Sequence, residues 1–209
     1  MVNWLKDNSI FGVLFDLKKT HLQLVQRCDE VLKLLLQQDA LDLELLNRFW
    51  SLTKSDLKPE VFKIISECSF YFKSSHVQFI FEQIQGTPRD QLELEELNCL
   101  SELGKYSRDQ DQKFQDKVAA YFWDILMSEQ PVSQELLENC TTKYKEIFIN
   151  WPAATKLLVY QELVKAVQSP NSKSVPTLRL FKILLKEHHN QVDLGYSNIT
   201  SYPAKAQDP

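Results

Sequence analysis

Residues 22–35 read LQLVQRCDEVLKLL, and their apolar positions recur three or four residues apart. That spacing places the apolar side chains on one side of an α-helix, and this side must be buried against another element. Residues 114–125, FQDKVAAYFWDI, show the same pattern, as do residues 137–147. The three stripes consist of Leu22, Val25, Cys28, Leu32 and Leu35; Phe114, Val118, Phe122 and Ile125; and Leu137, Cys140, Tyr144 and Ile147. A chain built of such segments forms stacked helices.

Similar patterns extend in both directions from these stripes, from about residue 3 to residue 186. Short polar links that carry proline or glycine separate them, and such links end one helix and start the next. We expect roughly nine or ten helices with short connections. They cover about residues 3–15, 18–38, 43–50, 59–72, 75–86, 87–103, 109–127, 131–150, 152–167 and 178–185.

The helices group into pairs of roughly forty residues, which is the length of armadillo or HEAT repeats. The four cysteines, Cys28, Cys68, Cys99 and Cys140, lie at about the same spacing. The predicted fold class is therefore an all-α, armadillo/HEAT-like α-solenoid. We expect one helical-repeat domain over residues 1–188. Residues 189–209 have few large aliphatic side chains and are predicted to form a disordered, flexible tail.

Composition excludes several classes of function. The 209 residues carry a formal net charge of −4, whereas nucleic-acid-binding domains usually show a basic stripe. Only four glycines are present, which disfavours phosphate-binding loops and tight strand turns. No apolar run approaches the roughly 20 residues that a membrane span needs. We expect no nucleic acid, membrane, cofactor or small-molecule ligand, and a cytoplasmic or nuclear protein without a signal peptide.

No catalytic or metal site is predicted. The cysteines show no CxxC spacing, and three of them fall on apolar stripes, which favours buried, reduced thiols. The histidines, His21, His76, His188 and His189, do not have metal-binding spacing from other ligand types. Acidic residues near 93–102 and 109–116 alternate with leucines or lie in a polar link, so a solvated surface explains them.

Two tryptophans are candidates for partner binding. Trp123 and Trp151 each adjoin a helix face that already has enough core residues. Tryptophan is enriched among the residues that dominate binding energy in protein interfaces. We therefore expect Trp123 or Trp151 to contact a partner protein, and alanine there to weaken binding while leaving the melting temperature nearly unchanged.

The N-terminal part of the sequence resembles a known family. Residues 4–15, WLKDNSIFGVLF, resemble the opening of the helical-repeat region in the giant ubiquitin-specific proteases of the fat-facets type. Later segments are similar to helices of that region, with good likeness to Ile84 and fainter likeness to Lys186. The segments are Arg27–Leu35, Leu43–Trp50, Val61–Glu67, Ser75–Phe81 and, more faintly, Val175–Phe181.

The resemblance implies a function that the helical pattern alone does not give. Proteases of this family remove ubiquitin with a cysteine-type catalytic domain, and no glycine-rich cysteine box of such a domain is recognisable here. The chain is thus expected to be a non-catalytic scaffold that positions ubiquitinated substrates or adaptors for a catalytic domain elsewhere. Two alternatives remain, a stand-alone helical-repeat adaptor unrelated to ubiquitin and a small all-α enzyme.

Overall fold

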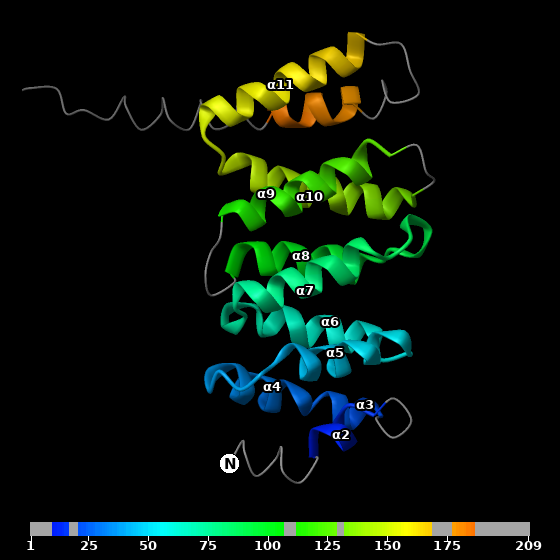
Figure 1. Cartoon of the computed structure of the whole chain (residues 1–209). Coiled ribbons are helices and arrows are strands. Elements are labelled where there is room, and N and C mark those ends of the chain that lie inside the picture. The colour runs from blue at the N-terminus through cyan, green and yellow to red at the C-terminus, as the bar shows by residue number, and fades with distance from the viewer. Residues whose placement is uncertain (1–9, 17–20, 107–111, 129–131, 169–176, 187–209) are drawn as a thin grey trace, which may run out of the picture.

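Helices stack one above another along a single direction in the computed structural model of the chain (Figure 1). The structure describes residues 10–16, 21–106, 112–128, 132–168 and 177–186. Within those ranges the regular elements are all helical, and no strand occurs. The predicted all-α solenoid is confirmed. The predicted tail, residues 189–209, lies outside the described residues.

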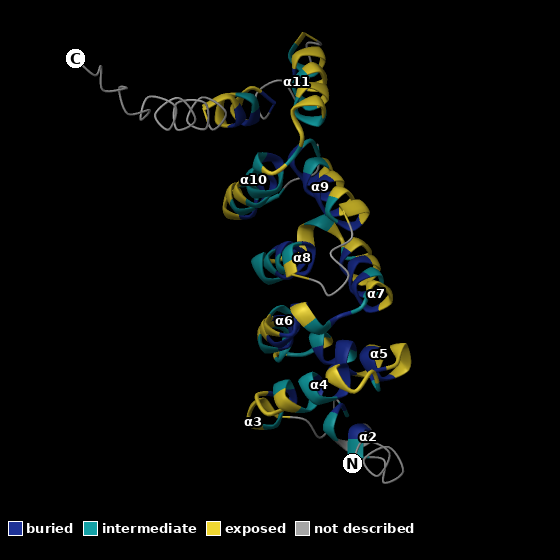
Figure 2. Cartoon of the chain, turned by 90° about the vertical axis from the view of Figure 1, so that its left-hand side faces the viewer, coloured by how far each residue is buried: buried dark blue, intermediate teal, exposed yellow. Residues whose placement is uncertain are grey.

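The helices form two columns. Figure 2 shows α6, α8, α10 and the helix over residues 177–186 in one column, and α5, α7, α9 and α11 in the other. Near the N-terminal end lie α2 (Ile10–Leu14), α3 (Leu22–Val25) and α4 (Cys28–Gln37). They are followed by α5 (Leu43–Ser51), α6 (Lys58–Glu67), α7 (Ser74–Gln85), α8 (Leu94–Tyr106), α9 (Gln112–Leu126), α10 (Gln134–Ile149) and α11 (Ala153–Gln168). Short 3₁₀ turns cover Leu52–Lys54, Ser69–Tyr71 and Arg89–Gln91.

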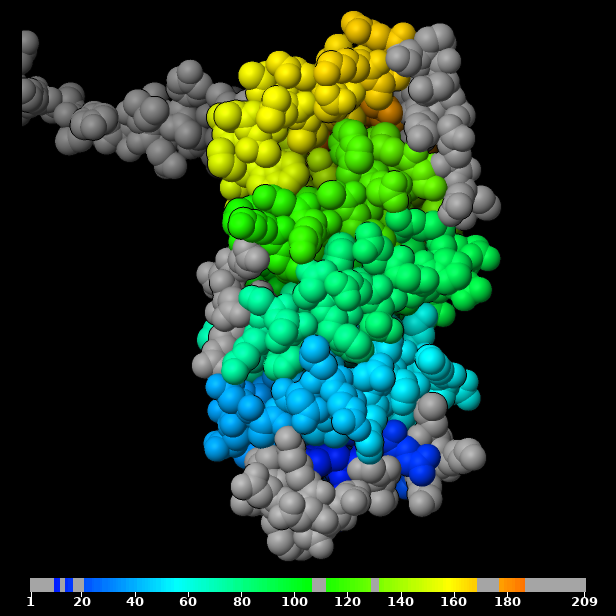
Figure 3. Space-filling model, viewed as in Figure 1, coloured from blue at the N-terminus to red at the C-terminus, as the bar shows by residue number. Residues whose placement is uncertain are grey.

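Polar contacts between neighbouring units reveal the repeat length. The Tyr121 hydroxyl donates to the Ile84 carbonyl, 37 residues away. Lys117 donates to the side chain of Gln78, 39 residues away, and Lys105 to Glu146, 41 residues away. The space-filling view shows the matching order, with successive parts of the chain stacked as bands (Figure 3). Each unit therefore packs on its neighbours in sequence, as in a solenoid.

Most residues of the apolar stripes are buried between these units and form a continuous core, whereas Leu22 is 50% exposed and Leu137 and Ile147 are half-buried. Leu32 and Leu35 on α4, Val118 on α9 and Cys140 on α10 are all fully buried, at 0% exposure. Full burial of a leucine side chain is worth about 1.5–3 kcal/mol relative to an exposed one. The four cysteines lie in α4, directly after α6, in α8 and in α10, and all four thiols are buried.

Three helices differ from the sequence expectation. The helix expected over residues 59–72 ends at Glu67, before the 3₁₀ turn Ser69–Tyr71. The helix expected over residues 18–38 breaks between α3 and α4, where the Arg27 N–H bonds to the Leu24 carbonyl in a tightened turn. The helix expected from Thr87 begins only at Leu94, after the 3₁₀ turn Arg89–Gln91. The later start follows from the side chain of Glu96.

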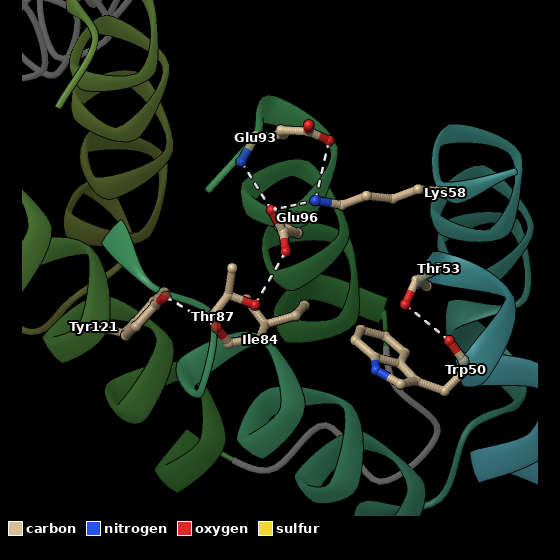
Figure 4. A network of polar contacts seen from close by, with 8 residues as sticks. All are labelled: Trp50, Thr53, Lys58, Ile84, Thr87, Glu93, Glu96 and Tyr121. Atoms are coloured by element: carbon tan, nitrogen blue, oxygen red, sulfur yellow. Dashed lines mark hydrogen bonds and ion pairs between the residues drawn. The ribbon is translucent and has the colours of Figure 1, made fainter. Parts of the chain in front are cut away.

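Glu96, which the sequence pattern placed on a solvated surface, instead joins three segments through one buried carboxylate. It is 2% exposed, and its Oε2 accepts from the Glu93 backbone N–H at 2.8 Å, which satisfies an amide at the start of α8. The other oxygen accepts from the Thr87 hydroxyl, which follows α7. Lys58 of α6 completes the network, its Nζ lying 3.3 Å from Glu96 and 3.0 Å from Glu93 (Figure 4). This carboxylate fixes where α8 starts and how α6 meets it.

Replacing Glu96 with alanine should lower the free energy of unfolding by about 2 kcal/mol, because the Glu93 N–H and the Thr87 hydroxyl lose a buried acceptor. Glu93→Ala is the matched control, since Glu93 pairs with the same lysine but is 53% exposed. That control should cost about 0.5 kcal/mol or less. Urea unfolding measures both, and equal losses would contradict the role assigned to Glu96.

Candidate partner-binding site

The described cysteines are not arranged as nucleophiles. All four are free and buried. Burial raises the pKa of Cys28 to about 11 and the pKa of Cys68, Cys99 and Cys140 to about 12. Thiolate is the reactive form of cysteine, so these thiols stay protonated and unreactive near neutral pH.

His76 is a structural residue at the start of α7. Its ring is 7% exposed, and burial lowers its pKa. Nδ1 accepts from the Lys73 N–H, and Nε2 lies 3.0 Å from the Leu41 carbonyl, to which the neutral ring donates. His21 is exposed just before α3, and His188 and His189 lie outside the described residues. No group of three or more histidine, cysteine, aspartate or glutamate residues in the described ranges could hold a metal ion.

The structure brings Trp123 and Trp151 together. Trp123 lies on α9, Trp151 follows α10, and Tyr144 of α10 contacts both rings. The centroid of the Tyr144 ring lies 5.8 Å from that of Trp123 and 6.1 Å from that of Trp151. Phe148 packs on Trp151 at 6.1 Å. Tyr144 and Phe148 are buried, whereas both tryptophans are half-buried, so the indoles form the accessible edge of an aromatic cluster.

The rings of Trp123, Tyr144 and Trp151 line a pocket of about 690 Å³ between α9 and α11. Its apolar walls include Ala119 and Ala120 of α9 and Val159 and Leu158 of α11, and Leu158 is 61% exposed. The remaining lining residues are polar or small: Gln112, Asp116, Asn150, Pro152, Thr155 and Glu162. The lining thus carries two carboxylates and no basic side chain. The sequence pattern singled out the two tryptophans but not Leu158. The exposure of Leu158 depends on how α11 packs beside α9, which the sequence pattern does not give.

The indole nitrogen of Trp151 is buried and has no hydrogen-bond partner among the described residues. A buried donor without an acceptor costs about 1–3 kcal/mol. The aromatic and apolar lining of the pocket suits an apolar or aromatic side chain of a partner.

Alanine substitution of Trp123 or Trp151 would change stability as well as partner binding. Both indoles pack against the core through Tyr144, so truncating either ring removes packing as well as a binding surface. The expectation of an almost unchanged melting temperature does not fit this geometry. A variant that keeps apolar volume, such as Trp151→Phe, separates binding from stability more cleanly.

Stacked helix pairs with apolar stripes buried between them define an armadillo-type helical-repeat protein. The model of one family, described as the UBP24/USP9X/USP9Y ARM repeat, matches residues 1–205, and the chain belongs to that family. The resemblance to the N-terminal repeat region of these ubiquitin-specific proteases is confirmed. No curated protein and no solved structure matches the chain.

None of the described helices combines the length and the apolar character that crossing a bilayer requires.

The native thiols should resist modification. An aromatic disulfide reagent at neutral pH should label Cys28, Cys68, Cys99 and Cys140 only after denaturant is added, because burial keeps them protonated and out of reach. A ubiquitin active-site probe should form no adduct with the folded chain. Stoichiometric capture of the probe at one of these cysteines would contradict this assignment and favour an enzyme.

Proposed function

We propose that this chain is a non-catalytic scaffold that holds ubiquitinated substrates or adaptor proteins near a ubiquitin-removing catalytic domain. Its membership of the ARM repeat family supports a link to ubiquitin-specific proteases. The pocket formed by Trp123, Tyr144 and Trp151 is the observation that carries the proposal, because it offers an aromatic surface of the kind that anchors protein partners. The four reduced thiols fit a cytoplasmic or nuclear protein.

The mechanism would be positional. The stacked units of a solenoid hold its surface in a defined shape. A partner bound near α9–α11 would therefore lie at a defined position relative to a catalytic domain joined to the scaffold. Raising the local concentration of a substrate next to a protease accelerates its cleavage without any change in the chemistry.

The experiment fuses the chain to the catalytic domain of a ubiquitin-specific protease and profiles ubiquitin removal across a cell's proteins. We expect a set of proteins to lose ubiquitin only when the chain is attached. A Trp123→Leu/Trp151→Phe double variant should reduce partner affinity about tenfold or more. The proteins of that set should then keep their ubiquitin.

Leu163→Ala provides the control, because Leu163 is fully buried on α11 and does not line the pocket. It should lower stability while the recruited set persists at temperatures where the chain stays folded. An unchanged set of substrates with and without the chain would reject the proposal. Tryptophan-dependent partners whose ubiquitination does not change would instead favour the stand-alone adaptor.

A further inference from the structure

A second depression, of about 810 Å³, lies between α10 and the 177–186 helix. One wall is a stripe of α10 that runs from Gln134 to Lys145, through residues three and four apart. The other wall is a matching stripe of the 177–186 helix, from Arg179 to Lys186. The result is a groove between two helices that are neighbours in the same column in Figure 2.

Contacts from other helices fix the outer wall of this groove. The Tyr160 hydroxyl of α11 donates to the Leu184 carbonyl at 3.2 Å, and the Tyr160 ring lies 5.8 Å from that of Phe181. The Thr177 hydroxyl lies 3.5 Å from the Met127 sulfur. Leu180 and Leu184 are buried, at 3% and 0% exposure. The groove is thus held open by packing rather than by a loose helix.

The lining of this groove is basic, although the chain as a whole is acidic. Four basic residues and one acidic residue, Glu138, line it, which gives a net charge of +3 on a chain whose total is −4. Arg179, Lys182 and Lys186 are exposed, and none of them pairs with an acidic residue in the described part of the chain. Lys145 is the fourth basic residue. Between the charges lies an apolar floor of Ile125, Leu126, Val132, Leu137, Leu180 and Ile183.

We propose that this groove binds an acidic amphipathic helix of a partner protein. The apolar floor would take leucine-type side chains at helical spacing, and the basic rim would pair with carboxylates on either side. The stripe of α10 is about 17 Å long, which matches about three helical turns. The inference deepens the proposed function, because it states the chemistry of a partner that the scaffold holds.

An acidic helix fits these observations better than a membrane or a nucleic acid. Both of those ligands are extended and bind through many phosphate contacts along a basic face. Here four basic side chains gather around one short groove, and the chain as a whole is acidic. About as many apolar as charged side chains line the groove, which a phosphate backbone would leave uncovered.

The test titrates the whole chain into a fluorescent synthetic helix that carries leucines at i, i+3, i+4 and i+7 flanked by glutamates. We expect saturable binding that weakens with salt, and no binding of a scrambled peptide of equal composition. The triple variant Arg179→Glu/Lys182→Glu/Lys186→Glu should bind about tenfold or more weakly. Thr142→Trp, at an exposed position in the lining, should block the groove without changing its charge.

The matched control is Arg48→Glu/Lys63→Glu/Lys165→Glu, which changes the net charge equally at exposed sites outside the groove. It should alter the affinity for the peptide by about twofold or less.

The proposal is overturned if the wild-type chain does not bind the peptide or if the control loses as much affinity as the groove variant. Tighter binding of phosphatidylserine vesicles or of an oligonucleotide would also overturn it. This binding test uses purified components and is independent of the recruitment experiment. Peptide binding to the groove can therefore fail while tryptophan-dependent recruitment persists, and recruitment can fail while the groove still binds the peptide.

Discussion

The burial of one apolar stripe per helix by the next helix pair is the constraint from which the structure follows. A single amphipathic helix pair leaves apolar surface in water, and adding a neighbour of similar shape removes it. Repetition of this step gives a core that runs without interruption from Phe11 to Leu184. It also explains why contacts such as Tyr121 to Ile84 and Lys105 to Glu146 join residues 37 and 41 positions apart.

The stripes and the fold class could be predicted from the sequence because they depend on local periodicity, and the family from the resemblance of short segments such as residues 4–15. Leu32, Val118 and Cys140 were all expected in the core, and all are fully buried. The start of α8 could not be predicted, since Glu96 caps it while pairing with Lys58, 38 residues earlier. The local sequence pattern does not predict a helix start that depends on side chains distant in the sequence.

The candidate site also has features that the sequence predicts and features that only the three-dimensional packing shows. Composition and neighbouring stripes singled out Trp123 and Trp151, but only the packing of α9, α10 and α11 shows that they share one pocket with Tyr144. The basic groove had no signal in the sequence. Its charges come from two helices, and the rim forms only because Tyr160 and Met127 hold the 177–186 helix beside α10. Consecutive residues of α10, Tyr144 and Lys145, thereby line different surfaces.

Hydrogen exchange on a Leu100→Ala variant tests the central claim, that each unit is stabilised by its immediate neighbours. Leu100 is fully buried in α8, which contacts α6, α7, α9 and α10. If stability is a sum of nearest-neighbour terms, exchange should accelerate in α8 and in those contacting helices and fade toward α4 and α11. Equal acceleration from α4 to α11, or acceleration confined to α8, would contradict the account.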